Sequence, residues 1–194
     1  MPLYRRELED FEARVTELKR TASGTNTEVA APIAALPAAK FKLVSTNNAE
    51  TYEVKRGARP FTDRNFTIQD LAPELDGLTG MRFSHEAAKS GRYEPIVFEV
   101  SEPVRVLIGF FNETREIWLP VPNPDLDAKA DERGGVETWI ENAAVIEQCP
   151  TVNLHAFRFE PGRHRLELPG KGSFVVLGVV PAAAPLQKRD AKLK

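Results

Sequence analysis

The chain contains few of the residues that support easily recognised chemistry. Among its 194 residues is a single cysteine, Cys149, which excludes an internal disulfide and a cysteine-based zinc site. Cys149 precedes a proline, has apolar neighbours and has no local basic partner, so we interpret it as a small buried hydrophobe rather than a nucleophile. No window approaches the roughly 20 apolar residues that a membrane-spanning helix needs. The net charge of -2 predicts no general attraction to nucleic acid or to a membrane.

Aromatic side chains and targeting signals are also scarce. Aromatic residues make up 8% of the chain, and its 11 phenylalanines indicate an aromatic core rather than a stacking surface. The N-terminal sequence MPLYRRELEDFEARV is charged throughout and lacks the apolar region of a signal peptide. We therefore expect a cytoplasmic protein if the chain is complete, and a secreted or periplasmic one if it is part of a longer exported protein.

The first segment, residues 1–20, is predicted to form an amphipathic helix. Its apolar residues follow a heptad spacing: Tyr4, Leu8, Phe11, Val15 and Leu18. An isolated helix of this length is marginal in water, so we expect it to dock on the rest of the chain or to form a homo-oligomer with a second copy. Residues 21–39 are rich in small residues and proline, which predicts a linker or strap.

Residues 40–182 are predicted to form one mainly β domain, an antiparallel β-sandwich of the jelly-roll type. Ile96–Val100 alternates between apolar and polar residues, which predicts a strand with one buried face. Val104–Phe111 is apolar on both faces, which predicts a central strand. Residues 136–146 are compatible with a strand or a short helix. We expect residues 183–194 to be a frayed basic tail.

Further strands are predicted after Cys149. The stretches TVNLHAFRFE and HRLELP read as two strands joined by a turn at Pro161 and Gly162, and GKGSFVVLGVV reads as the last strand.

Several stretches between Thr51 and Pro120 resemble the galactose-binding-like β-sandwich modules attached to bacterial polysaccharide-degrading proteins. The matching residues are Phe61, Asp63 and Arg64, Leu78 and Thr79, Val97, Phe98 and Val100, Val104 and Val106, and Trp118 and Leu119. The resemblance implies an accessory sandwich that binds carbohydrate. Where such modules often carry an Asp followed by an Arg, this chain has Gly109–Phe111, and Arg115 is the residue that could replace the basic group.

The strongest candidate ligand site is the edge around Asn112, Arg115 and Trp118. Sugar recognition needs an aromatic face for the apolar side of a pyranose and planar donors for its hydroxyl groups, and these residues supply both. Tyr93 is a second candidate aromatic residue near this edge. The alternative is that Trp118 belongs to the core, because Ile117 and Leu119 flank it.

The acidic loop at residues 121–135 is a second candidate. Asp131 and Arg133 precede a pair of glycines, and acidic side chains in such a turn can bind Ca²⁺, although the spacing is not that of an EF-hand. The alternative is a solvated turn in which Asp131 braces Arg133. No cofactor other than a structural calcium ion is expected.

The remaining polar residues favour structural roles. Asp63 and Arg64 are adjacent, which favours a salt bridge or a turn brace. His155 and His164 share strand faces with apolar residues and are interpreted as near-core, whereas His85 is placed at the mouth of a loop. No histidine spacing supports a metal site. Glu86, Glu94, Glu116, Asp131 and Glu137 are all available as an acid/base pair, so the sequence selects no catalytic residues.

The sequence therefore favours a non-catalytic carbohydrate-binding or accessory module whose partner is a glycan or another protein domain. A structural or assembly protein that associates through residues 1–20 is the first alternative. The second is a glycan-active enzyme with an unrecognised carboxylate pair.

Overall fold

A computed structural model describes residues 33–44, 49–92, 94–112, 138–166 and 174–193. The chain divides into two compact units, Met1–Ile33 and Ala34–Lys194, and the fold described here is that of the second. The predicted helix at residues 1–20, most of the predicted strap and the acidic loop lie outside the described residues.

The described residues are mainly β, as the sequence predicts. In chain order the elements are β1 (Lys42–Leu43), β2 (Glu50–Glu53), β3 (Ile68–Leu71), the 3-10 helix η1 (Pro73–Leu75), β4 (Thr79–Arg82), α2 (His85–Lys89), β5 (Ile96–Val100), β6 (Val104–Phe111), β7 (Thr138–Ile146), β8 (Val152–Phe159), β9 (Gly162–Leu166), β10 (Phe174–Pro181) and β11 (Arg189–Asp190). None of the helices in this described part is long and apolar enough to cross a membrane.

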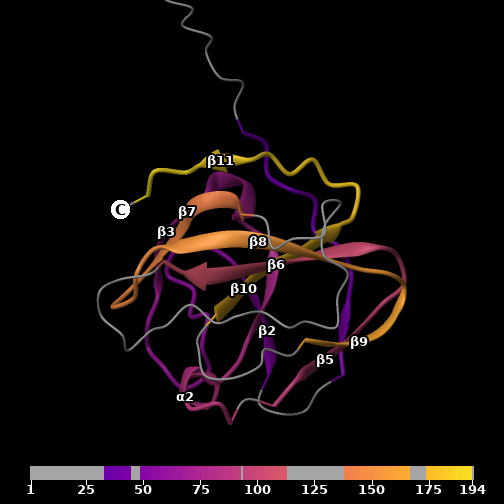
Figure 1. Cartoon of the computed structure of the whole chain (residues 1–194), viewed down its shortest axis with the longest axis horizontal. Helices are drawn as coiled ribbons and strands as arrows, with labels where there is room; N and C mark the ends of the chain where they lie inside the picture. Colours follow the sequence, from indigo (N-terminus) through magenta and orange to yellow (C-terminus); the bar gives the residue numbers. More distant parts are fainter. Residues whose placement is uncertain (1–32, 45–48, 93, 113–137, 167–173, 194) are drawn as a thin grey trace, which may run out of the picture. The chain divides into compact units, whose positions relative to one another are not determined.

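The strands form two sheets (Figure 1). The large sheet has the order β11-β7-β8-β6-β10-β4-β2, with β3 also paired to β7, and the small sheet has the order β1-β5-β9. All pairs are antiparallel except β11 with β7. Strands β8 and β9 follow each other in the chain but belong to different sheets, so the turn at Pro161 carries the chain from one sheet to the other.

Strands β6 and β10 lie in the middle of the large sheet because both of their faces are apolar. All eight residues of β6 are buried, which confirms the central strand predicted for Val104–Phe111. Val106 and Ile108 face a hydrophobic cluster that includes Phe98 of β5 and Leu166 of β9. The small sheet therefore packs on this face of the large sheet. Leu107 and Phe111 face a second cluster on the opposite side.

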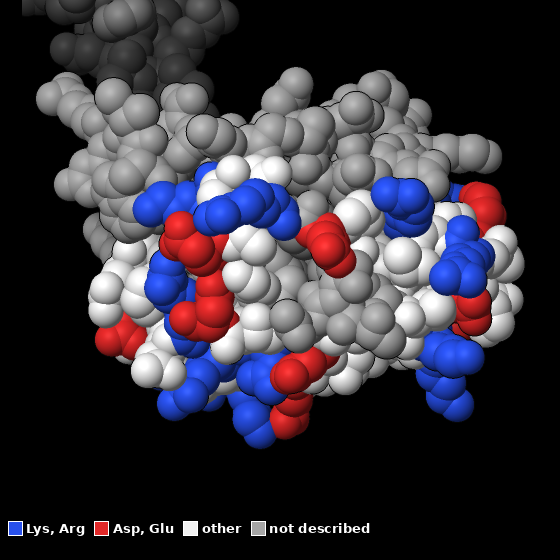
Figure 2. Space-filling model, turned by 90° about the horizontal axis from the view of Figure 1, so that it is seen from below, with Lys and Arg blue, Asp and Glu red and all other residues white. Residues whose placement is uncertain are grey.

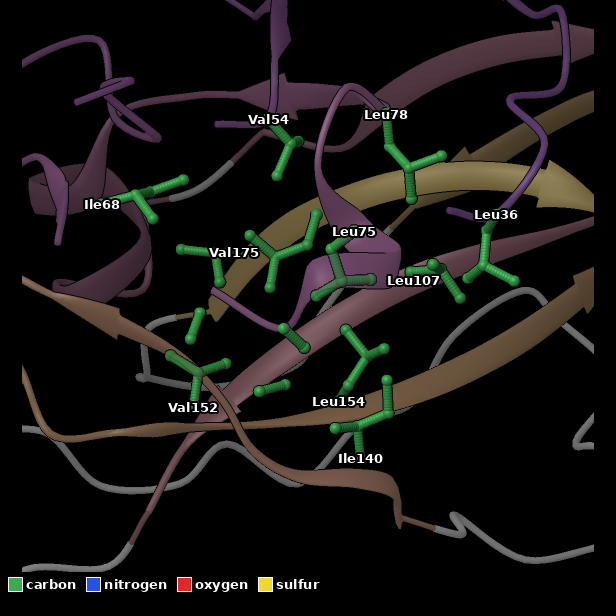
Figure 3. Close-up of a cluster of buried hydrophobic side chains, with 14 of the residues drawn as sticks. Leu36, Val54, Ile68, Leu75, Leu78, Leu107, Ile140, Val152, Leu154 and Val175 are labelled. Atoms are coloured by element: carbon green, nitrogen blue, oxygen red, sulfur yellow. The ribbon is translucent and has the colours of Figure 1, made fainter. Parts of the chain in front are cut away.

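The large sheet curls around the second cluster. The backbone N–H of Gly57 donates to the carbonyl of Ile68 at 2.8 Å, and the N–H of Ile68 donates to the carbonyl of Ala58 at 2.9 Å. The segment after β2 is thus bonded to β3, and β3 pairs with β7. Backbone hydrogen bonds therefore link the β2 end of the large sheet to β7, near its opposite end. Figure 3 shows the enclosed cluster, with Leu75 of η1 lying among Leu107 and Val175.

Three segments differ from, or refine, the sequence predictions. Residues 136–146 form a strand from Thr138, which resolves the choice between strand and helix. His85 does not lie at a loop mouth but begins α2 and is buried. Within the expected frayed tail, β11 pairs with β7, and the Arg189 guanidinium makes two hydrogen bonds to the Glu74 carboxylate at 2.6 and 2.8 Å. A buried partner thus holds this segment in place.

Candidate functional site

Of the six ligand-binding residues predicted from the sequence, the structure describes Asn112. The other five lie outside the described residues: Tyr93, Arg115, Trp118, Asp131 and Arg133. Asn112 directly follows β6, where the backbone N–H of Asn112 donates to the carbonyl of Thr151 at 2.8 Å. This position places Asn112 at the end of the central strand and at the base of the segment that carries most of the other candidates.

Asn112 belongs to a network of polar side chains that we call the amide cluster: Asn112, Asn142, Thr151, Asn153 and Asp190. The Asn112 Nδ2 group donates to Asn142 Oδ1 at 3.1 Å and to Thr151 Oγ1. Thr151 Oγ1 in turn donates to Asn142 Oδ1 at 3.0 Å. Both amide protons of Asn112 are therefore used within the protein, and no hydrogen bond from another described residue reaches its side-chain oxygen.

Asn142 is at the centre of the amide cluster because the strand bulges there. Between Ile140 and Ala144 the register of β7 on β8 is interrupted, and Asn142 has a φ of 49°, a left-handed conformation that Asn tolerates better than most residues. The Asn142 N–H donates to Asn153 Oδ1 at 2.9 Å, and its Nδ2 donates to Asp190 Oδ1 at 3.0 Å. The latter bond holds the pKa of Asp190 below its usual value.

The Asp63 carboxylate holds the N-terminus of α2. It accepts hydrogen bonds from Ser84 Oγ at 2.8 Å and from the backbone N–H groups of His85 and Glu86 at 2.7 and 3.0 Å. Burial alone would raise the pKa of Asp63, but these hydrogen bonds together outweigh it and lower the pKa. Arg64 forms a salt bridge with Glu86 at 2.6 Å. The predicted structural role of Asp63 and Arg64 is confirmed.

The three histidines all pack against aromatic rings. His85 is 3% exposed, its ring lies 4.6 Å from the Phe61 ring, and neither of its ring nitrogens has a hydrogen-bond partner among the described residues. Burial, followed by the nearby Arg64 charge, lowers its pKa. The His155 ring lies 5.2 Å from the Phe110 ring, and the His164 ring contacts the rings of both Phe98 and Phe159. Across the described ranges, no three His, Cys, Asp or Glu residues are grouped so as to hold a metal ion.

Two further polar features were not anticipated from the sequence. Trp139 of β7 is half-buried, and the Arg105 guanidinium and the Lys188 ammonium lie 5.5 and 5.8 Å from its ring centroid. Such distances are within the range of cation–π attraction, so the ring contributes to holding two cations. Trp139 falls within residues 136–146, which the sequence left open between strand and helix, so its neighbours could not be predicted.

The second feature is a groove at the margin of the small sheet. It has a volume of about 400 Å³ and is lined by Lys40, Phe41, Lys42, Glu99, Val100 and Ser101. Lys40, Lys42 and Ser101 are exposed, and Phe41 is half-buried. The groove thus combines cations, a hydroxyl group and part of an aromatic ring. In the sequence, lysines alternate with Phe41 and Leu43, which indicates a strand, but this pattern does not show that the strand pairs with β5.

The structure supports the interpretation of Cys149 as a small buried hydrophobe rather than a nucleophile. Its side chain is partly buried against the cluster enclosed by the large sheet, and burial raises the pKa of the thiol to about 11. The thiol is therefore protonated at neutral pH, as expected for a small hydrophobe.

The fold is similar to parts of two glycoside hydrolases of known structure. The first is a GH138 enzyme targeting pectin rhamnogalacturonan II, with a TM-score of 0.69, 29% sequence identity and coverage of 98% of this chain. The second is a β-glucuronidase from glycoside hydrolase family 2, with a TM-score of 0.40, 12% identity and coverage of 80% of this chain. No protein-family model matches the chain, and no curated protein does.

The chain spans only about a fifth of the GH138 enzyme, because the match covers 21% of that protein. It covers 14% of the β-glucuronidase, whose similarity is too slight to support an argument. The match to the GH138 enzyme alone therefore relates this β-rich fold to part of a carbohydrate-processing protein.

Proposed function

We propose that this chain is a non-catalytic, carbohydrate-binding β-module of a polysaccharide-processing protein, with a galactose-binding-like fold. The observation that carries the proposal is the similarity to a GH138 enzyme, which extends over 98% of this chain but only 21% of that one. A unit of that relative size, built from two packed sheets, suits an accessory part of a larger carbohydrate-active protein.

The arrangement of carboxylates supports a non-catalytic role. Glycoside hydrolysis needs two carboxyl groups that face each other across a cleft. Several carboxylates of the described residues instead have a cationic partner: Glu50 with Arg82, Asp70 with Arg56, Glu74 with Arg189, Glu86 with Arg64, and Glu160 with Arg158. Asp63 is used to hold α2. These carboxylates therefore have structural partners within the fold.

The proposed glycan contact is the edge that begins at Asn112 and includes Arg115 and Trp118. Asn112 supports this assignment because the amide cluster fixes its orientation while its side-chain oxygen remains available to a sugar hydroxyl group. Tyr93, Asp131 and Arg133 are proposed to belong to the same edge, with Asp131 as a candidate ligand of a structural calcium ion.

Affinity electrophoresis of the full chain in gels containing rhamnogalacturonan II, polygalacturonate or galactan tests the proposal. We expect retardation by at least one glycan, and we expect Trp118→Ala to weaken that retardation if the edge is the site. Trp139→Phe is the matched control, because it alters the other tryptophan. Absence of retardation by any glycan would contradict the proposal. If deletion of residues 1–20 also lowered the mass measured by light scattering, an assembly role would replace it.

A further inference from the structure

The outer face of the small sheet is basic. In an antiparallel sheet, residues paired across strands point to the same side. Lys42 of β1 pairs with Glu99 of β5, and Glu99 pairs with Arg163 of β9. Val97 pairs with Arg165 in the next row. Because Phe98 and Leu166 point into the core, these alternate residues point outward.

This surface, which we call the basic face, consists of Lys40, Lys42, Glu99, Arg163 and Arg165. It contains four cations and one carboxylate, whereas the chain as a whole has a net charge of -2. Lys40, Lys42, Arg163 and Arg165 are all exposed. Figure 2 shows one face of the molecule, on which Lys and Arg side chains are interspersed with Asp and Glu side chains. Among the described residues of this sheet, cations therefore outnumber carboxylates.

The spacing of the cations is set by the sheet. Arg163 and Arg165 are two residues apart on one strand, a separation of roughly 7 Å. Lys42 lies two strands away from Arg163, a separation of roughly 10 Å. A rigid sheet thus presents several cations at separations that fit charged groups repeated along a polymer. Arginine adds the planar pair of donors that matches a carboxylate.

The groove beside this face supplies contacts that a simple ionic surface lacks. Lys40 and Lys42 belong to the basic face and also line the groove, together with Ser101 and with Phe41, which packs in part against the cluster that contains Phe98. An aromatic ring suits the apolar side of a pyranose, and hydroxyl and carboxylate oxygens suit its hydroxyl groups. Glu99 pairs with Lys42 on one side and with Arg163 on the other, and its carboxylate can accept hydrogen bonds from sugar hydroxyl groups.

We propose that the basic face and its groove bind an acidic glycan through the carboxylates of its uronic acid residues. The inference rests on the proposed function and names the class of glycan and a second contact surface, apart from the edge at Trp118. It agrees with the similarity to an enzyme that targets a pectin, a class of polysaccharide rich in uronic acids.

Titration of the full chain with polygalacturonate tests the inference, with Arg163→Ala/Arg165→Ala as the variant. We expect the double variant to bind about tenfold more weakly, because two charge-assisted contacts are lost. The matched control is Lys55→Ala/Arg56→Ala, which removes the same charge from two exposed cations at the turn after β2. We expect the control to bind as the wild type does, and urea unfolding confirms that both variants fold.

Two further measurements separate uronate recognition from general attraction. Glu99→Gln removes the one carboxylate of the face, and we expect it to strengthen polygalacturonate binding about twofold to threefold through reduced repulsion. Dextran sulfate at equal charge concentration should compete poorly, because it lacks the planar carboxylate. Equal competition by dextran sulfate would overturn the uronate assignment.

The remaining outcomes distinguish this inference from the proposed function. Binding of galactan without polygalacturonate would keep the carbohydrate-binding function and overturn the acidic class. Binding of polygalacturonate with equal affinity by the wild type and the Arg163→Ala/Arg165→Ala variant would overturn the location. Failure to bind any of the glycans would remove the proposed function itself, and the inference with it.

Discussion

At the scale of single residues, Gly109 shows how a small side chain allows the central strand to be buried on both faces. A Cβ atom at Gly109 would contact Val152 Cγ1 and would lie 2.8 Å from Val175 Cγ2. Such distances are shorter than real Cβ contacts, so a larger residue would force the neighbouring strands apart. The departure from the galactose-binding-like pattern at Gly109–Phe111 therefore has a packing reason in this chain.

His85 makes stability depend on pH. Its ring is buried without hydrogen-bond partners, and burial and Arg64 lower its pKa in the folded state. Lys89 acts in the same direction, while Asp63 and Glu86 oppose it. Below the unfolded pKa of about 6.5, the unfolded chain binds more protons than the folded one. Stability contributed by neutral His85 is therefore lost as pH falls from about 6.5 toward the lowered pKa.

Urea unfolding of the wild type and of His85→Phe between about pH 7.5 and pH 5.5 checks this prediction. Phenylalanine preserves the contact with the Phe61 ring but cannot titrate. We expect the wild type to lose more stability than the variant over this interval. The two proteins are otherwise identical, so the contributions of all other residues cancel in the comparison. Parallel loss of stability in the two proteins would contradict the prediction.

At the scale of elements, Glu74 and Arg189 hold β11 against η1. The Glu74 side chain is 6% exposed and that of Arg189 is 20% exposed, so the pair is largely removed from water. Removing the cation alone leaves a buried carboxylate without its partner, at a cost of about 3–5 kcal/mol. We expect Arg189→Met to lower the free energy of unfolding by about this amount, and Glu74→Gln/Arg189→Met to recover part of the loss.

Denaturant unfolding of the two variants measures the difference directly. Lys188→Met is not a suitable control because Lys188 contacts Trp139, but Lys192→Met changes a neighbouring exposed cation and should alter stability by no more than about 0.5 kcal/mol. If the double variant were as unstable as Arg189→Met, the unpaired carboxylate would not be the cause.

Elements with a regular apolar pattern could be predicted from the sequence, and those set by distant contacts could not. Ile96–Val100 and Val104–Phe111 are strands as predicted, because alternation and a two-sided apolar run each report burial directly. Residues 138–146 were ambiguous because the bulge at Asn142 breaks the alternation. The helix α2 depends on the Asp63 carboxylate, which lies 22 residues before His85 in the sequence.

The same limit applied to the candidate site. Asn112 was proposed as a planar donor beside Arg115 and Trp118, but its hydrogen-bond partners come from β7 and from the segment before β8, which the sequence does not reveal. The basic face could not be recognised because Lys42, Glu99 and Arg163 are brought together only by strand pairing. A local pattern shows that each is exposed, but it does not show that they share one surface.

At the scale of the whole β unit, the two hydrophobic clusters depend on the same strands. Leu107 and Ile108 are neighbours on β6 but face opposite clusters. Disruption of either cluster therefore disturbs the strand on which the other is built. We expect Leu107→Ala and Ile108→Ala each to lower the free energy of unfolding by about 2–5 kcal/mol, and to do so for the unit as a whole.

Native-state hydrogen exchange of the β6 and β10 amides measures this coupling. We expect the slowest amides of both strands to lose protection by the same free energy in each variant, with Ser101→Ala as an exposed control. Loss of protection on one side of the large sheet alone would show that the two clusters unfold separately.

The arrangement of cations on the small sheet also bears on how these molecules behave when crowded together. Within the described residues, β1 and β9 are the outer strands of that sheet, and such strands offer unpaired backbone groups to another chain. Lys42 lies on one of them, and Arg163 and Arg165 lie on the other. Like charges on both margins repel a second copy and discourage sheets from fusing edge to edge. The residues proposed to attract an acidic polymer therefore also protect the protein against aggregation.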